Sequence, residues 1–378
     1  MKLDHIGIEV RDLYSVELFY RKALGFSPRY RYVSQNSPGL RTVFLERDGV
    51  ALELLERPRD DGFPGERARA PNHVSLEVAD VDGAYARLAA LGLPGAALTS
   101  PRDTGDGYRE MSLRDPEGNV VELSTRLRPA PRYPVRAVIF DVDGTLVDSE
   151  ENYLLADQEL LARRGIAFTR EDKRRYIGGG NLDMMIDLKR RFELAETAHA
   201  LAAEKNVLYL ELARDTRAFP EMERFLCMVR EKGIPVAAAS GSSPSVLEHV
   251  LAAAGLSRHL DIVVSAEDVP RGKPAPDVFL EAARRLAVPP QACVTVEDSS
   301  HGVEASCRAF MRCIAVPYLV EEPLADAFSM ADLLFDRGMS TFDAARAAAW
   351  LEPLVVGPPP VSGPDRAPSP QGDPERPS

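Results

Sequence analysis

Residues 135–145 read Val-Arg-Ala-Val-Ile-Phe-Asp-Val-Asp-Gly-Thr, and this stretch decides the fold of the larger part of the chain. Val135 to Phe140 is a short apolar run, which is typical of a buried strand in a parallel sheet. It leads directly into two carboxylates, Asp141 and Asp143, with one residue between them. Ligand sites of open α/β sheets lie at the carboxyl ends of the strands. We therefore expect chemistry at this turn.

Further short apolar runs fit the same sheet. They span residues 234–239, 262–264, 293–296 and 314–316. Segments with helical character separate them, and this alternation predicts a doubly wound α/β fold with a parallel sheet. A long insertion, about residues 150–218, follows the first strand and is rich in helix-forming residues. We expect its helices over residues 150–164, 181–192 and 196–214.

Several of these runs end in reactive groups. Ser240 and Gly241 begin a turn of small residues, whose hydroxyl and backbone N–H groups suit phosphate oxygens. Lys273 follows the next run and could neutralise phosphate charge. Glu297 and Asp298 come after the run at 293–296, where an acidic pair suits a hard cation such as Mg²⁺.

These four motifs, in this order, resemble those of the haloacid dehalogenase superfamily over roughly residues 135–337. The resemblance implies phosphoryl transfer through an aspartyl-phosphate, with Asp141 as nucleophile and Mg²⁺ ligand. It implies that Asp143 protonates the leaving oxygen and then activates water, while its backbone carbonyl contacts the metal. Lys273 would balance the charge of Asp141 and the transferred group. The remaining implied roles are phosphoryl binding by Thr145, Ser240 and Gly241, and Mg²⁺ binding by Glu297 and Asp298.

The helical insertion resembles the α-helical cap of the β-phosphoglucomutase-like branch, and such a cap closes over the site. In β-phosphoglucomutase an arginine of the cap turn grips a second phosphate, and a histidine follows the first motif. Asn181 and Tyr153 stand at the matching positions here. These departures favour a phosphatase acting on a sugar or sugar-like polyol phosphate, and a phosphomutase is the alternative. The glycine-rich turn at 177–181 either approaches the substrate or only connects two helices.

The first part of the chain repeats one pattern. Residues 4–10 alternate like a strand, residues 12–22 are amphipathic like a helix, and strand-like runs follow at 26–33, 41–47 and 50–56. The same order recurs with a strand at 72–78, a helix at 81–91 and strands near 95–99, 109–114 and 119–125. Two βαβββ units, an α+β arrangement, are the simplest interpretation. Polar residues recur too, because His73 follows His5 by 68 positions and Glu122 follows Glu53 by 69.

This repeat resembles the vicinal oxygen chelate superfamily, which includes glyoxalase I, over residues 1–126. The resemblance implies that the two units form a cup that holds a divalent metal, and the matching positions are His5, Glu53, His73 and Glu122. Such a ligand set suits Zn, Ni, Co, Mn or Fe. The domain would then be a metal-dependent epimerase, isomerase or lyase. A binding module without chemistry, or a scaffold whose carboxylates face water, is the alternative, because this fold does not select a reaction.

The resemblance to both superfamilies suggests one narrower setting. Both occur in the biosynthesis of aminocyclitols. A cyclitol phosphate or pseudodisaccharide phosphate is therefore one expected substrate, with antibiotic biosynthesis in secondary metabolism as its setting.

The 378 residues are expected to form a glyoxalase-like domain (1–126), a proline-rich linker (127–134), a hydrolase domain (135–356) and a disordered proline-rich tail (357–378). The net charge of 46 − 58 = −12 argues against nucleic-acid or anionic-membrane partners. We expect a small phosphorylated substrate as the partner, and a homodimer stays open. Four cysteines, no signal-peptide pattern and no long apolar run predict a soluble cytoplasmic enzyme.

Overall fold

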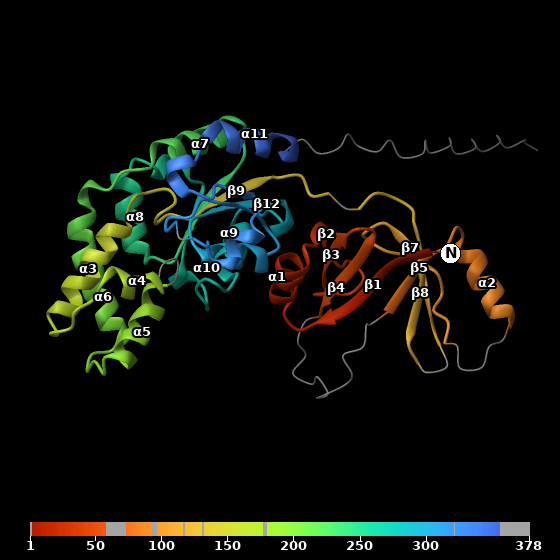
Figure 1. Ribbon diagram of the computed structural model, residues 1–378. Helices are drawn as coiled ribbons and strands as arrows, with labels where there is room; N and C mark the ends of the chain where they lie inside the picture. The colour runs from red at the N-terminus through yellow and green to blue at the C-terminus, as the bar shows by residue number, and fades with distance from the viewer. Residues whose placement is uncertain are drawn as a thin grey trace, which may run out of the picture.

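The computed structural model describes residues 2–57, 73–91, 97–115, 118–130, 132–176, 180–320 and 322–355. Two separate sheets organise this part of the chain (Figure 1). The expected tail (357–378) and residues 177–179 of the glycine-rich turn lie outside the described residues. Within them, no helix is both long enough and apolar enough to cross a membrane.

The eight-stranded sheet contains two repeats of the predicted unit. The first comprises β1 (Lys2–Val10), α1 (Leu13–Leu24), β2 (Ser27–Val33), β3 (Arg41–Arg47) and β4 (Val50–Glu56). The second comprises β5 (His73–Glu77), α2 (Val81–Leu91), β6 (Arg102–Asp103), β7 (Tyr108–Arg114) and β8 (Val120–Arg126). In each unit the first strand pairs in parallel with the last, and β1 pairs antiparallel with β5 to join the units. The strand order β2-β3-β4-β1-β5-β8-β7-β6 confirms the repeat.

The strand predicted near residues 95–99 of the second unit is wrong over its described residues, and residues 95–96 lie outside the described part of the chain. Residues 97–100 form no strand, and the short edge strand β6 occurs at Arg102–Asp103 instead. Thr99 still donates its N–H to the Ser112 carbonyl at 2.8 Å. Pro101 follows, and because proline has no N–H to donate, it interrupts a longer ladder at this edge.

The six-stranded sheet is parallel throughout, as predicted. Its strands are β9 (Ala137–Phe140), β10 (Val236–Ser240), β11 (Ile262–Ser265), β12 (Cys293–Glu297), β13 (Arg312–Ala315) and β14 (Leu333–Leu334), in the order β11-β10-β9-β12-β13-β14. Alternate side chains of β9 enter different cores. Val138 and Phe140 pack with α7 (Pro220–Glu231), α8 (Pro244–Ala253) and α11 (Ala344–Val355). Ala137 and Ile139 pack with α9 (Asp277–Arg285) and α10 (Ser300–Arg308) on the other face.

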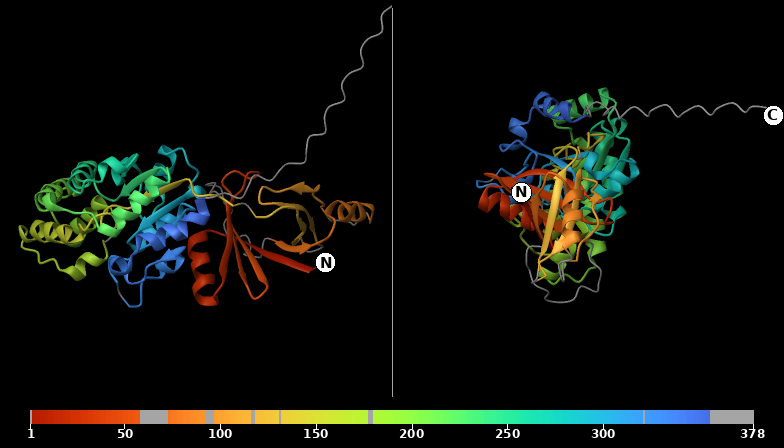
Figure 2. Two further views of the ribbon diagram at one scale, coloured as in Figure 1. Left: turned by 90° about the horizontal axis from the view of Figure 1, so that it is seen from above. Right: turned by 90° about the vertical axis from the view of Figure 1, so that its right-hand side faces the viewer.

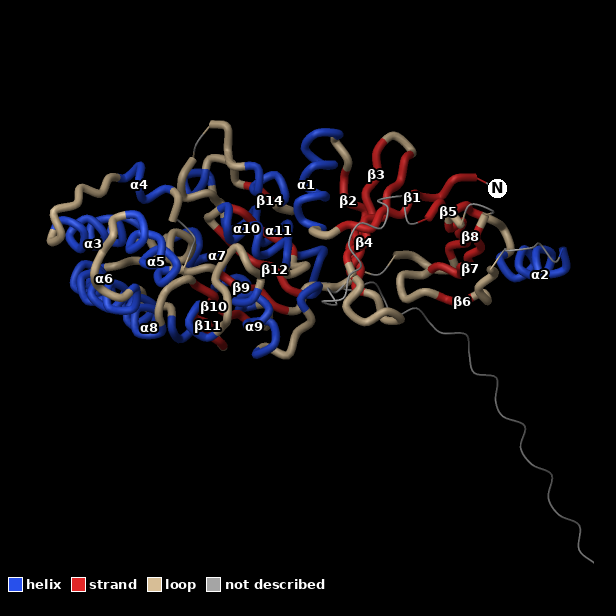
Figure 3. The backbone as a smooth tube through the Cα atoms, turned by 90° about the horizontal axis from the view of Figure 1, so that it is seen from below, coloured by secondary structure: helices blue, strands red, loops and turns tan. Residues whose placement is uncertain are grey.

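Four helices form the insertion between β9 and β10. They are α3 (Glu150–Ala162), α4 (Arg170–Arg174), α5 (Asn181–Arg191) and α6 (Ala198–Leu212). Figure 2 shows these helices at one end of the molecule and the eight-stranded sheet at the other, with the parallel sheet between them. The tube view separates the two groups of strands in the same way (Figure 3). The predicted helical cap is therefore confirmed.

Helix α1 of the first repeat packs against α10 of the parallel sheet. Tyr14 joins a buried cluster with Val303, Cys307 and Phe328. The Arg308 guanidinium lies 4.9 Å from the centre of the Tyr14 ring and donates to both Asp12 oxygens, at 2.8 and 3.0 Å. The two parts of the chain thus share an apolar core and a bidentate ion pair.

Replacing Tyr14 by alanine should destabilise the full-length protein by about 3 kcal/mol, because it opens a cavity in this shared cluster. Phe19→Ala on the same helix is the matched control, since Phe19 is 56% exposed and its loss should cost within about 0.5 kcal/mol. Guanidinium denaturation of both variants measures the difference. Equal midpoints for the two variants would contradict an interface built on Tyr14.

Candidate functional site

The predicted catalytic residues meet at one edge of the parallel sheet. β9 lies between β10 and β12, and Asp141 follows β9 while Ser240 and Glu297 end its two neighbours. Because the strands are parallel, all three carboxyl ends open onto the same edge. The topology thus brings together groups that lie up to 156 positions apart in the sequence, since 297 − 141 = 156.

A buried lysine bridges two carboxylates of this group. Lys273 Nζ donates to Asp141 Oδ1 at 2.5 Å and to Glu297 Oε1 at 2.6 Å, and it also donates to the Ala239 carbonyl at 3.2 Å. Burial alone would lower the pKa of Lys273, but the charges of Asp141 and Glu297 raise it instead. The ammonium therefore stays charged, and it fixes the position of the Asp141 carboxylate.

Three of the buried carboxylates form a group that fits a hard cation. Ligand oxygens of Asp141, Glu297 and Asp298 all lie within 4.8 Å of one another. Burial, followed by the charges of Glu297 and Asp143, raises the pKa of Asp141 to about 8 despite Lys273. Asp298 Oδ2 is buried and makes no hydrogen bond. An all-oxygen set with an orphaned carboxylate oxygen suits Mg²⁺.

Glu297 and Asp298 differ in how free their oxygens are. Glu297 Oε1 accepts from Lys273, and Oε2 accepts from the backbone N–H groups of Asp298 and Ser299, at 3.1 and 3.4 Å. Asp298 Oδ2 keeps its lone pairs free. Gly144 makes room for it, because a Cβ at Gly144 would overlap the Asp298 carboxylate. Gly144 also has a φ of +80°, which favours glycine. Asp298 is thus the more direct candidate ligand.

The Asp143 carboxylate is held by hydroxyl groups and is not one of the three carboxylates that converge. Ser149 Oγ donates to Asp143 Oδ1 at 2.8 Å, and the Ser240 and Ser242 hydroxyls donate to Oδ2 at 3.0 and 2.7 Å. Tyr153 extends this network, because its hydroxyl lies 2.5 Å from Ser242 Oγ. Hydroxyls can both donate and accept, so this network can follow a change in the protonation of Asp143.

Two of the three expected phosphoryl-binding residues border a small cavity of about 50 Å³. Ser240 and Gly241 line it beside Asp141 and Asp143. Thr145 Oγ1, in the loop that follows Asp143, is buried and has no hydrogen-bond partner within the described part of the chain. An unpartnered buried hydroxyl is costly, which is consistent with a ligand oxygen as its missing partner.

The cap adds an ion-pair network that the sequence motifs did not indicate. Lys173 Nζ lies 2.8 Å from Asp157 Oδ2, and Lys205 Nζ lies 2.7 Å from Asp157 Oδ1. Both lysines line the small cavity. Burial and the Lys173 charge lower the pKa of Lys205 to about 8, although Asp157 opposes this shift. Three isolated positions on three helices carry no motif, so only the fold brings them together.

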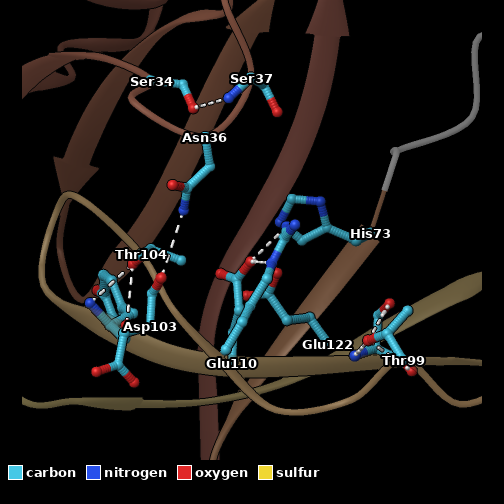
Figure 4. A network of polar contacts seen from close by, with 12 residues as sticks. Ser34, Asn36, Ser37, His73, Thr99, Asp103, Thr104, Glu110 and Glu122 are labelled. Atoms are coloured by element: carbon cyan, nitrogen blue, oxygen red, sulfur yellow. Dashed lines mark hydrogen bonds and ion pairs between the residues drawn. The ribbon is translucent and has the colours of Figure 1, made fainter.

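The eight-stranded sheet carries a second polar group. His5 Nε2 lies 2.9 Å from His73 Nε2, and Glu53 Oε2 lies 3.4 and 3.3 Å from the two nitrogens. Hydrogen bonds from the histidines outweigh burial and lower the pKa of Glu53 to about 2. Both repeats line a cavity of about 460 Å³ around these residues, which we call the cup (Figure 4).

Two residues that the motif did not indicate support the His5–His73 pair. Asp4 Oδ2 lies 2.8 Å from His5 Nδ1. A neutral His5 that donates its Nδ1–H to Asp4 would have its Nε2 lone pair available to a metal in place of the hydrogen bond to Glu53. Carboxylates commonly orient metal-binding histidines in this way. Gly7 is paired opposite His73, and a Cβ there would overlap the imidazole ring. Two nitrogens and one carboxylate converge, which fits Zn, Ni, Co, Mn or Fe.

Glu122, the fourth expected ligand, is not part of this close group. Its Oε1 accepts from Ser75 Oγ at 2.8 Å, although the side chain still lines the cup. Glu110 lines the cup as well, near Glu122 (Figure 4). Burial and the charge of Glu122 raise the pKa of Glu110 to about 7. A metal held by all four predicted residues would need Glu122 to turn toward the histidines.

Comparison with protein-family models divides the chain in the same way. Residues 2–123 match the Glyoxalase/Bleomycin resistance protein/Dioxygenase superfamily. Residues 135–308 match the haloacid dehalogenase-like hydrolases. Both predicted resemblances are therefore confirmed.

Curated relatives match the hydrolase part. Hexitol phosphatase B of Escherichia coli K12 is 35% identical over 193 residues, which cover 48% of this chain and 84% of that protein. The fructose-1-phosphate phosphatase of the same strain is 31% identical over 183 residues, which cover 48% of this chain and 96% of that protein.

Solved structures share the fold of this part. CbbY from Rhodobacter sphaeroides, crystallised with xylulose-(1,5)bisphosphate, is 26% identical with a TM-score of 0.50, over 55% of this chain and 96% of that chain. A β-phosphoglucomutase from Clostridium difficile is 24% identical with a TM-score of 0.50, over 59% of this chain and 100% of that chain, and shows the fold alone. The chain is therefore a phosphatase of the haloacid dehalogenase-like hydrolase family, with an N-terminal domain of the glyoxalase superfamily.

Proposed function

We propose that the chain is a Mg²⁺-dependent phosphatase that hydrolyses the phosphate monoester of a sugar or a sugar-like polyol. The observation that carries this proposal is the buried group of Asp141, Glu297 and Asp298 around Lys273. Of the three carboxylates, Asp141 and Glu297 share the one ammonium of Lys273, and a divalent cation would offset the negative charge that remains. The similarity to hexitol and fructose-1-phosphate phosphatases supports the substrate class.

Asp141 attacks the phosphorus atom, so that a new P–O bond forms to its carboxylate while the ester P–O bond breaks. Bound Mg²⁺ would lower the repulsion between this carboxylate and the anionic ester. The Lys273 ammonium, which donates to Asp141 Oδ1, also lowers this repulsion. Asp143 gives its proton to the leaving oxygen, and it then takes a proton from the water that hydrolyses the aspartyl-phosphate. The serine hydroxyls around Asp143 stabilise both of its protonation states.

The cap favours a leaving group rich in hydroxyls. Asn181 lines the small cavity, and its Nδ2 donates to Asn206 Oδ1 at 3.0 Å. Its Oδ1 is buried and has no hydrogen-bond partner among the described residues. A free amide oxygen accepts a hydroxyl proton but repels a second phosphate. Both cap lysines are already paired with Asp157. This cavity therefore suits a monophosphate better than the bisphosphate intermediate of a mutase. A cyclitol phosphate or pseudodisaccharide phosphate of secondary metabolism satisfies the same chemistry.

Asp141→Asn should lower phosphate release from hexitol, hexose and cyclitol phosphates by roughly 10³-fold or more, because it removes the nucleophile. The measurement is a colorimetric phosphate assay with Mg²⁺. Asp148→Asn is the matched control, since it makes the same change at an exposed carboxylate of the same loop. Release above about 1% of the parent rate in pure Asp141→Asn protein would refute the nucleophile. A parent enzyme that isomerises the phosphate without releasing it would indicate a mutase.

Asn181→Ala should raise KM for the best polyol phosphate about 3- to 10-fold with a smaller effect on kcat, because one uncharged hydrogen bond to the leaving group is lost. His199→Ala on the exposed face of the same cap serves as the control. Steady-state kinetics on both variants make the comparison. An unchanged KM in Asn181→Ala would remove Asn181 from the substrate contacts.

For the N-terminal domain we propose a second divalent metal, bound by His5, Glu53 and His73. The convergence of their ligand atoms and the Asp4 contact behind His5 favour this site. The bound metal would polarise substrate oxygens as a Lewis acid. The domain would then catalyse an epimerisation, isomerisation or lyase reaction, with the carboxylates of the cup available to move a proton.

His73→Ala should lose about one equivalent of Zn²⁺ or Ni²⁺ per chain after loading and gel filtration, because it removes one of three close ligands. Elemental analysis measures the metal directly. His199→Ala again provides the control, because it also removes one histidine, but from helix α6 of the cap and not from the cup. Equal metal content in the parent and His73→Ala would favour a binding module without a metal.

A further inference from the structure

The cup is much larger than the cavity of the hydrolase site, about 460 Å³ against about 50 Å³. Its lining comes from both repeats and surrounds the His5–Glu53–His73 group. A cavity of this size accommodates a small organic molecule. The chemistry of its walls indicates which kind of molecule fits.

The described walls of the cup carry many short hydroxyl and amide side chains. They include Ser34, Asn36, Thr99, Thr104 and Ser112. Several are held in place by neighbours, since Ser34 Oγ accepts from the Ser37 N–H at 3.0 Å and Asn36 Nδ2 donates to the Asp103 carbonyl at 3.4 Å (Figure 4). Fixed groups that both donate and accept match the hydroxyls of a sugar or polyol.

The charged residues of the described walls do not suit a phosphate group. Arg102 donates twice to Glu110 Oε1, at 3.0 and 2.8 Å, and Arg57 lies 3.5 Å from Glu9. The other acidic residues that line the cup are Glu53, Asp106 and Glu122. Five carboxylates of the described lining thus face two arginines, and each arginine is already paired with a carboxylate, so a phosphate would have to compete with that carboxylate for the arginine.

We propose that the cup binds a neutral polyhydroxylated molecule and discriminates against its phosphate ester. This proposal rests on the proposed phosphatase function. The hydrolase site would first remove the phosphate, and the cup would then bind the neutral product of that reaction. The two domains would thus act on one compound before and after dephosphorylation.

The test uses the full chain with Asp141→Asn, so that phosphate esters persist, loaded with Co²⁺. Co²⁺ bound in the cup is followed by its visible absorption. The part of this absorption that is lost in the double variant Asp141→Asn/His73→Ala is assigned to Co²⁺ bound by the cup histidines. D-mannitol, D-fructose and the 1-phosphates of both are titrated separately. The neutral compounds should perturb this absorption at concentrations at least about 10-fold lower than their phosphates, a difference of about 1.4 kcal/mol.

A charge variant sharpens the comparison. Glu110→Gln removes the negative charge that neutralises Arg102, although its amide oxygen can still accept a hydrogen bond. It should therefore tighten binding of the phosphates about 10-fold and change binding of the neutral compounds less than about threefold. Glu77→Gln, at a surface ion pair with Lys2, is the matched control. Isothermal titration calorimetry of the same compounds gives a readout that does not need cobalt.

Three outcomes would overturn the proposal: phosphates that bind the cup as tightly as the neutral compounds, no binding of either neutral compound by either method, or no gain in phosphate affinity in Glu110→Gln. None of them depends on hydrolysis, so failure here is distinct from failure of the phosphatase, which the phosphate-release assay detects separately.

Discussion

The hydrolase site depends on one buried ammonium between two carboxylates. Lys273 reaches Asp141 and Glu297 from a loop beyond β11, and the carboxylates belong to neighbouring strand ends. Without this charge, burial of Asp141, Glu297 and Asp298 together would be strongly unfavourable. The ammonium also lies 4.9 Å from the centre of the Phe279 ring, so α9 supports it from the core. Sheet, loop and helix are thus fixed relative to one another at the point where chemistry is expected.

The sequence was most informative where local patterns coincide with function. The apolar runs of the parallel sheet are short and continuous because both faces of the sheet are covered. Three of its strands, β9, β10 and β12, lead directly into motif residues. The repeat in residues 1–126 was equally clear, because corresponding strands of the two units show the same alternation of apolar and polar residues. The strand expected near 95–99 was wrong over its described residues, 97–99, because the apolar residues on which it was based do not account for Pro101, two positions further along the chain.

The sequence did not indicate those site residues that come together only when separate elements pack in the folded chain. Lys173, Lys205 and Asp157 lie on three cap helices, and none belongs to a recognisable spacing. Asp4 and Gly7 flank His5 in the sequence, yet their roles appear only when His73 pairs across from Gly7. Glu122 matched Glu53 by repeat offset, but its hydrogen bond to Ser75 keeps it out of the close ligand group. Sequence symmetry therefore predicted the fold better than it predicted side-chain geometry.

The two domains are joined in a way that links the hydrolase site to the N-terminal fold. Helix α10 begins directly after the Glu297-Asp298 loop, and its far end bears Cys307 and Arg308, which contact α1. The helix that follows the acidic loop is therefore packed against α1 at its other end. The first repeat therefore supports the hydrolase core as well as forming half of the cup. A fusion that served only to tether two enzymes would not need to bury Tyr14 in a cluster of the other domain.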